Sequence, residues 1–225
     1  MTESQTPPAQ TPGFSWLSGW SRILLDMFAI TFGVLLAFTL NEWWTRRNTA
    51  ERVERSVANI MSELDRNAAS LERAYDYRLE IYPRILDMLS GEMRFQDVRF
   101  RGTQPPQIER AAYDVAISTG TLSEVDPGTA EAIVGAYLSF DRIMGTHRTY
   151  SSGLPSLIFQ SESPDDPRGA IYLQMAFQDF IYAETAGLNH LAEMEVTEAK
   201  PPAWEVISGF MSEAETQAAA PTAED

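Results

Sequence analysis

Few side chains in this sequence are spaced for catalysis or metal binding. The two histidines, His147 and His190, do not stand in a metal-ligand pattern, and Glu193 follows His190 in the reverse of the Glu-x-x-His order of di-iron bundles. Asp165 and Asp166 suit acid-base chemistry as a pair, but the flanking prolines favour helix-capping turn residues. We interpret both histidines as helix-surface or cap residues. We expect no catalytic residues, no metal and no cofactor.

The composition argues against further classes of function. The chain has no cysteine, which excludes disulfides and thiol catalysis, and it contains no P-loop, nucleophile elbow or EF-hand loop. The net charge is -15, and from Tyr150 onward thirteen acids meet only Arg168 and Lys200. Such a surface repels phosphate backbones, so nucleic acid is not an expected partner. With 44% hydrophobic residues, the rest of the chain can bury the core of one domain.

The apolar stretch from Ile23 to Leu40 is the element on which the position of the rest of the chain would depend. It carries a single charge, Asp26, and is long enough to cross a hydrocarbon core of about 30 Å as a helix. We predict an uncleaved transmembrane anchor over 22–44, because the stretch exceeds a usual signal-peptide core and no small-x-small cleavage site follows it. Tryptophans and arginines typical of membrane interfaces flank it: Trp16, Trp20, Trp43, Trp44, Arg46 and Arg47.

One face of the predicted anchor combines small and polar residues at helical spacing. Its members are Asp26, Ala29, Ile30, Gly33, Ala37 and Asn41. Small residues four apart allow close helix approach, and a carboxyl in a membrane needs a partner. We therefore expect this face to pack against another transmembrane helix, from a second copy or another subunit. Alternatively, Asp26 extends to the headgroups.

A long helix is predicted over 45–90, because no glycine or proline follows Asn41 until Pro83. An apolar stripe repeats every eleven residues along it and has to be covered by a partner. Pro83 is expected to kink or restart the helix, and Ser90 with Gly91 to end it. The stripe consists of Val53, Val57, Ile60, Leu64, Leu71, Tyr75, Leu79, Tyr82 and Leu86. We interpret the arginines of this helix as solvated-face residues paired with nearby acids.

The remaining segments complete an all-α fold, in which a transmembrane helix continues into a long helix packed with about three further helices. Residues 1–21 are a disordered tail, 91–106 a loop with a possible short strand at Met93 to Val98, and 107–199 a helical cap. The cap contains a helix from Ile108 to Thr119, one after Asp126 that is interrupted around Pro155, and one from Pro167 to about Met194. Residues 200–225 hold a short amphipathic piece with Trp204, then a disordered acidic tail from Ala214.

The anchor resembles that of a group of uncharacterised bacterial single-pass membrane proteins grouped as a domain of unknown function. The motif Gly-Val-Leu-Leu-Ala through Asn-x-Trp carries the resemblance, together with an acid ahead of it, and the later YDVAISTGTLSEVDPG is similar to that group's second region. The matching positions are Asp26, Gly33, Val34, Leu35, Asn41 and Trp43. The resemblance implies a bacterial inner-membrane location and this architecture, without an assigned activity.

Orientation and function remain open between alternatives. Arg46, Arg47, Arg52 and Arg55 follow the anchor and Arg22 precedes it, so the positive-inside rule places the C-terminal domain in the cytoplasm, with the periplasm as the alternative. We expect an interaction or scaffold protein whose partners are the bilayer and another transmembrane helix, for example an accessory subunit of a membrane complex. The alternative is a sensory or small-molecule-binding module; an enzyme is the least expected.

Overall fold

A computed structural model describes residues 16–94, 97–98, 100–160 and 167–219. In those ranges the chain is helical and forms no strand, which confirms the predicted all-α class. The chain divides into two compact units, residues 1–52 (unit 1) and residues 53–225 (unit 2), each of which is described by itself.

Unit 1 consists, where it is described, of the first part of α1, a helix that spans Trp16–Ser90 and continues into unit 2. The helix begins at Trp16, ahead of residue 22, where the membrane anchor is predicted to start; the bounds of the anchor stay a prediction. Two threonine hydroxyls, of Thr39 and Thr45, donate to the carbonyl oxygens four residues earlier at 2.8 Å. These bonds satisfy hydroxyls within a helix whose surroundings offer no other protein partner in the described residues.

In unit 2, α1 passes through Pro83 without a break and ends at Ser90. Of the two predicted effects of Pro83, a restart of the helix was therefore wrong and a kink stays a prediction, while the predicted end is confirmed. Gly91 has a φ of 82°, in the left-handed region where helices commonly terminate, and its N–H donates to the carbonyl of Met88. A described part of the following segment, Met93 to Arg94 and Asp97 to Val98, contains no strand.

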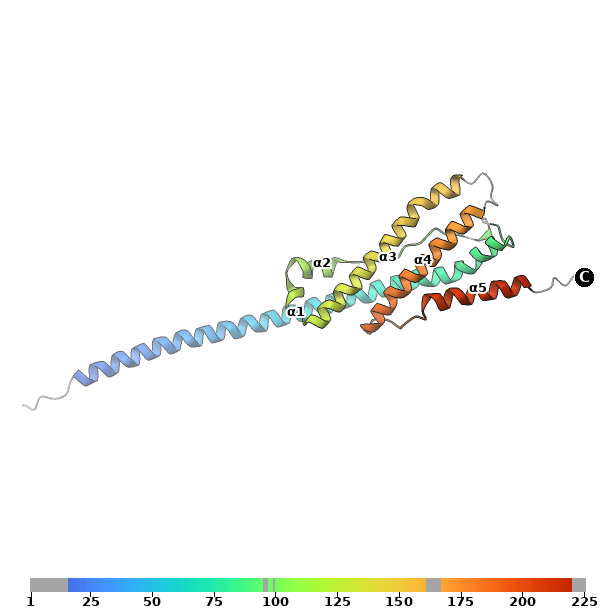
Figure 1. The fold of residues 1–225 in the computed structure, drawn as a ribbon. Coiled ribbons are helices and arrows are strands. Elements are labelled where there is room, and N and C mark those ends of the chain that lie inside the picture. Colours follow the sequence, from blue (N-terminus) through green and yellow to red (C-terminus); the bar gives the residue numbers. More distant parts are fainter. Residues whose placement is uncertain (1–15, 95–96, 99, 161–166, 220–225) are drawn as a thin grey trace, which may run out of the picture. The chain divides into compact units, whose positions relative to one another are not determined.

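Four further helices and one 3-10 helix follow α1 in unit 2: α2 (Ala111–Ser118), η2 (Thr121–Glu124), α3 (Pro127–Gln160), α4 (Pro167–Glu193) and α5 (Ala203–Ala219). Figure 1 shows α3, α4 and α5 running alongside the unit 2 part of α1. The start of α3 was predicted correctly, because Asp126 Oδ1 accepts the Thr129 N–H at 3.0 Å. Hydrogen bonds with Thr129 also lower the pKa of the Asp126 carboxyl.

Three predicted boundaries were wrong. Helix α3 continues through Pro155 to Gln160, so the predicted interruption around Pro155 was wrong. Helix α2 begins at Ala111 instead of Ile108, and α5 extends to Ala219, beyond the predicted start of a disordered tail at Ala214. The predicted capping residues Asp165 and Asp166 lie outside the described residues.

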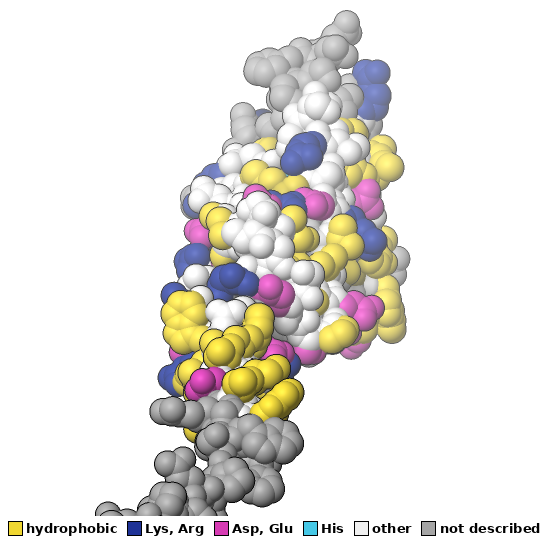
Figure 2. All heavy atoms as spheres, turned by 90° about the vertical axis from the view of Figure 1, so that its left-hand side faces the viewer, with side chains coloured by type: hydrophobic (Ala, Val, Ile, Leu, Met, Phe, Trp, Pro, Cys, Tyr) yellow, Lys and Arg dark blue, Asp and Glu magenta, His cyan; other side chains and the backbone are white. Residues whose placement is uncertain are grey.

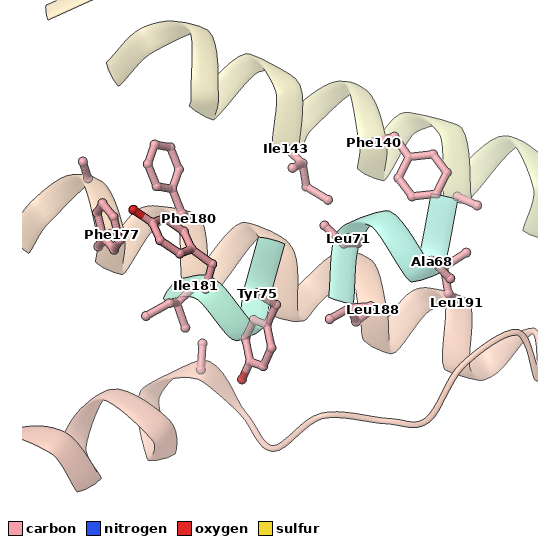
Figure 3. Packing of buried hydrophobic residues seen from close by; sticks show 14 of the residues in the cluster. Ala68, Leu71, Tyr75, Phe140, Ile143, Phe177, Phe180, Ile181, Leu188 and Leu191 are labelled. Carbon is pink, nitrogen blue, oxygen red and sulfur yellow. The ribbon is translucent and has the colours of Figure 1, made fainter. Parts of the chain in front are cut away.

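The apolar stripe of α1 forms the core of unit 2. Figure 3 shows Leu71 of α1 between Ile143 of α3 and Leu188 of α4, and these three side chains are each at most 1% exposed. Most of the stripe is buried: Ile60, Leu64, Leu71, Tyr75, Tyr82 and Leu86. Val53, Val57 and Leu79 are half-buried. The prediction that a partner must cover the stripe was wrong, since the chain's own later helices cover it.

Close approach of α3 and α4 depends on a glycine. A Cβ at Gly187 would lie 2.6 Å from Ile143 Cδ1 and 3.3 Å from Leu71 Cδ2, both below ordinary contact distance. The absence of a side chain at this position lets α4 approach α3 and α1 together. Gly187 thus sets the tight packing around the middle of the stripe.

Candidate functional site

The apolar side chains of unit 1 are exposed along the whole described stretch. Leu25, Phe28 and Phe38 are each 68% exposed, and all residues from Ile23 to Trp44 belong to the exposed class. Figure 2 shows hydrophobic side chains gathered in the lower part of the view, beside residues that are not described, and charges of both signs spread over the rest. Within the described residues, α1 is the one helix that is long and apolar enough to be a candidate membrane span.

The predicted packing face and interface residues all lie on this part of α1. Asp26, Ala29, Ile30, Gly33, Ala37 and Asn41 are exposed, and a Cβ at Gly33 would meet no atom within 4 Å. Trp20, Trp43 and Trp44 are exposed, whereas the side chain of Trp16 is not described. Arg46 pairs with Glu42, and Arg47 pairs with Glu51 at 3.2 Å with its guanidinium 5.7 Å from the Trp43 ring centroid.

A second candidate site lies in the core of unit 2, where three ionisable side chains meet. His147 of α3 lies beside Glu184 of α4, with His147 Nε2 3.0 Å from Glu184 Oε1. Arg78 of α1 places Nη2 3.5 Å from the same oxygen and 2.9 Å from the carbonyl oxygen of Gln104. Arg78 and Glu184 are fully buried and His147 is 2% exposed. This buried triad joins α1, α3 and α4.

Aromatic rings surround the buried triad. The His147 ring stacks on Phe180 with centroids 4.1 Å apart, and the Arg78 guanidinium lies 5.0 Å from the Phe180 centroid and 5.3 Å from those of Tyr77 and Phe177. Burial lowers the pKa of Arg78, and the Glu184 carboxylate partly opposes this change. Ring faces and the carboxylate together make the buried guanidinium less costly.

Several polar atoms of this region have no hydrogen-bond partner in the protein. Among the described residues these are Arg78 Nε and Nη1, His147 Nδ1, Glu184 Oε2 and Thr185 Oγ1. We call Arg78, His147, Glu184 and Thr185 the core cluster. An unpaired buried donor or acceptor costs about 1–3 kcal/mol, so five such atoms on these four residues require an explanation.

A third polar feature holds the segment between α1 and α3. Buried side chains on one side of α1, which we call the docking seam, bind the backbone of this segment: Glu63, Asn67, Ser70, Tyr77 and Arg78. From Glu63 to Tyr77 the order is antiparallel. Asn67 receives the Glu109 N–H at 2.8 Å and donates to the Glu109 carbonyl at 2.9 Å. Ser70 Oγ accepts the Gln107 N–H at 2.8 Å, and Tyr77 donates to the Gly102 carbonyl at 3.1 Å.

Glu63 anchors the end of this segment and the start of α2. Its carboxylate accepts the N–H of Ala112 at 2.7 Å and of Tyr113 at 3.3 Å, and it also accepts the Tyr137 hydroxyl. It therefore satisfies backbone donors that a helix start leaves without a helical partner. Burial, followed by the bond with Glu63, raises the pKa of Tyr137.

The histidines behave differently from each other. His147 is a core residue, so its interpretation as a surface or cap histidine was wrong. His190 is partly exposed, with Nε2 3.3 Å from the Ala132 carbonyl oxygen and Nδ1 3.6 Å from Glu193 Oε2. No group of three or more possible metal ligands occurs among the residues that the structure describes.

Sequence reasoning missed the core cluster and the docking seam. The seam carries a usable signal, because Glu63, Asn67 and Ser70 recur at steps of four and three beside the apolar stripe. The burial of Arg78 and Glu184 carries no comparable signal, since the two residues are far apart in the chain and each looks like an ordinary surface charge.

No protein-family model matches the chain, and neither curated proteins nor solved structures provide a match.

Proposed function

We propose that this chain is a membrane-anchored helical interaction protein, held in a bacterial inner membrane by the first part of α1. The observation that carries the proposal is the contrast between the two units. The stripe of unit 2 is buried by the chain itself, whereas the large apolar side chains from Ile23 to Leu40 are 49–68% exposed. Exposed apolar surface of this length is stable in the hydrocarbon core of a bilayer and costly in water.

The partner in this proposal is another transmembrane helix, from a second copy or from a subunit of a larger complex. The face with Gly33 and Ala37 supports this, because small residues let two backbones approach closely. Asp26 on the same face supports it as well, since an intramembrane carboxyl gains from a polar partner. Association through the stripe of unit 2 is no longer part of the proposal.

A comparison of two variants tests the association. Gly33→Leu adds bulk to the proposed packing face, and Thr31→Leu adds an apolar side chain on nearly the opposite face as a matched control. Both should insert into the membrane, and only Gly33→Leu should reduce the mass of the complex measured in mild detergent. An unchanged mass for Gly33→Leu would contradict the packing face, and identification of co-purifying chains distinguishes self-association from a foreign complex.

The side of the membrane can be determined with the same protein. The chain contains no cysteine, so Ser208→Cys, at an exposed position on α5, introduces a single thiol. The arginines that follow the apolar stretch support a cytoplasmic location. Protection from a membrane-impermeant maleimide in intact cells, with labelling after lysis, is the expected result; labelling in intact cells would place unit 2 in the periplasm.

A second candidate function is a sensory or small-molecule-binding module. The five unpaired atoms of the core cluster favour it, because polar atoms between helices are where bundles bind small molecules. Mass spectrometry of compounds released by denaturing the purified chain tests it. Release of a stoichiometric compound supports this candidate.

A further inference from the structure

Two buried polar groups in the same bundle differ in how well the protein satisfies them. Glu63 uses both carboxylate oxygens, toward α2 and Tyr137. Glu184 uses only Oε1, and its Oε2 has no partner among the described residues. We propose that the core cluster is a bound-water site, in which internal water molecules join its unpaired atoms.

The Arg78–Glu184 ion pair is long and uses one atom of each side chain. Arg78 Nη2 lies 3.5 Å from Glu184 Oε1, longer than the 2.7–2.9 Å usual for charged N–H···O bonds. Only one guanidinium nitrogen and one carboxylate oxygen take part, so the fork of two parallel bonds that arginine forms with carboxylates is absent here. The second oxygen and the other two nitrogens therefore need a different partner.

The chemistry of the unpaired atoms matches water. Arg78 Nε and Nη1 are donors, Glu184 Oε2 is an acceptor, and Thr185 Oγ1 is both. When His147 Nε2 donates its hydrogen to Glu184, its Nδ1 is an acceptor as well. Water both donates and accepts, and a buried water typically makes about three hydrogen bonds to such atoms.

The charges of the cluster disfavour an ionic ligand. The negative Glu184 carboxylate and the positive Arg78 guanidinium offset each other, so the pair offers no net charge to an ion. A small uncharged donor and acceptor is therefore the class of ligand that fits. This inference competes with the second candidate function for the same atoms and is independent of the membrane anchor.

Hydroxyl-radical footprinting of the full chain in detergent tests the proposal. Radicals formed from bound water label adjacent rings even where bulk solvent has no access. Phe180, beside His147 and Arg78, and Phe140, beside the fully paired Tyr137, are the same residue type and 0% and 1% exposed, so they form a matched pair. We expect Phe180 to be labelled several-fold faster than Phe140. Equal rates would overturn the proposal.

A variant without the charged groups separates bound water from unfolding. In Arg78→Met with Glu184→Leu three of the five unpaired atoms are removed, and Phe180 labelling should fall toward the rate of Phe140. An unchanged rate in the folded double variant contradicts the proposal. If circular dichroism shows that the double variant does not fold, Thr185→Val removes one partner of the water and should lower the Phe180 rate in part; no decrease counts against the site.

The released compounds distinguish the two explanations of the core cluster. If the denatured wild-type chain releases no small molecule while Phe180 is labelled rapidly, water occupies the site and the second candidate function loses its support. If a stoichiometric compound is released, the water proposal is wrong and the second candidate function gains support. In both cases the association through Gly33 remains to be judged by its own experiment.

Discussion

Single buried polar side chains carry much of the specificity of unit 2. Glu63 is 1% exposed and is bound by two backbone N–H groups and one hydroxyl. By itself it looks like one more surface residue on a helix rich in Arg and Glu, and only its spacing with Asn67 and Ser70 beside the apolar stripe sets it apart. Its role depends on a helix start that lies nearly fifty residues later.

Substitution of Glu63 should destabilise the protein. In Glu63→Gln an amide NH2 group replaces one carboxylate oxygen and faces a backbone N–H, so two donors oppose each other in a buried place. We expect the free energy of unfolding to fall by about 1–3 kcal/mol. Urea denaturation of the chain in detergent measures the change, with Glu131→Gln at an exposed position as the control. A loss no larger than that of the control would contradict the capping role.

The hydrogen bond of Tyr150 predicts a stability loss in alkali. Tyr150 donates to Asp179 Oδ2, and this bond, followed by burial, raises the pKa of Tyr150 to about 12. Because a tyrosine in the unfolded chain has a pKa near 10, the stabilisation is complete below pH 10 and is lost as the pH rises through about 12. Tyr150→Phe removes this contribution.

Denaturation at several pH values checks the effect of Tyr150. The difference in free energy of unfolding between wild type and Tyr150→Phe should shrink from pH 8 to pH 12. Tyr137 titrates in the same direction and is present in both proteins, so it cancels in the difference. A difference that stays constant over this range would show that the Asp179 bond does not control the titration.

At the scale of elements, the segment before α2 has an extended backbone held by side chains. Asn67 makes two bonds to Glu109, a pairing that resembles a step of a ladder between strands. In Asn67→Ala both bonds are lost, and amide hydrogen exchange of residues 103–113 should become faster while exchange in α4 is little changed. Asn48→Ala, at an exposed position, is the control. Equal exchange in both variants would contradict the seam.

An element could be predicted where its signal is local in the sequence. The apolar period of α1 and the Asp-Pro start of α3 are local signals, so the sequence was sufficient for both. Proline was misleading as a break signal at Pro83 and Pro155, since both residues lie inside helices. Around Pro83 the buried side chains of Tyr82 and Ile85 hold the helix in the core and compensate for the local break. The core cluster could not be predicted, since it exists only once three distant helices meet.

At the scale of the whole molecule, unit 2 contains a complete core. The stripe of α1 is covered by α3 and α4, so residues 53–225 should fold without unit 1. We expect this fragment to be soluble, helical by circular dichroism and cooperative in thermal unfolding. A fragment without a cooperative transition would show that the core of unit 2 depends on unit 1.

The coverage of the α1 stripe by α4 has a consequence for synthesis. The ribosome completes α1 long before it reaches Leu188 and Leu191, the α4 residues that lie against the stripe in Figure 3. At a typical synthesis rate of about 5–20 residues per second, the stripe stays uncovered by α4 for seconds. The nascent chain therefore exposes the apolar stripe of α1 to chaperones before α4 has been synthesised to cover it.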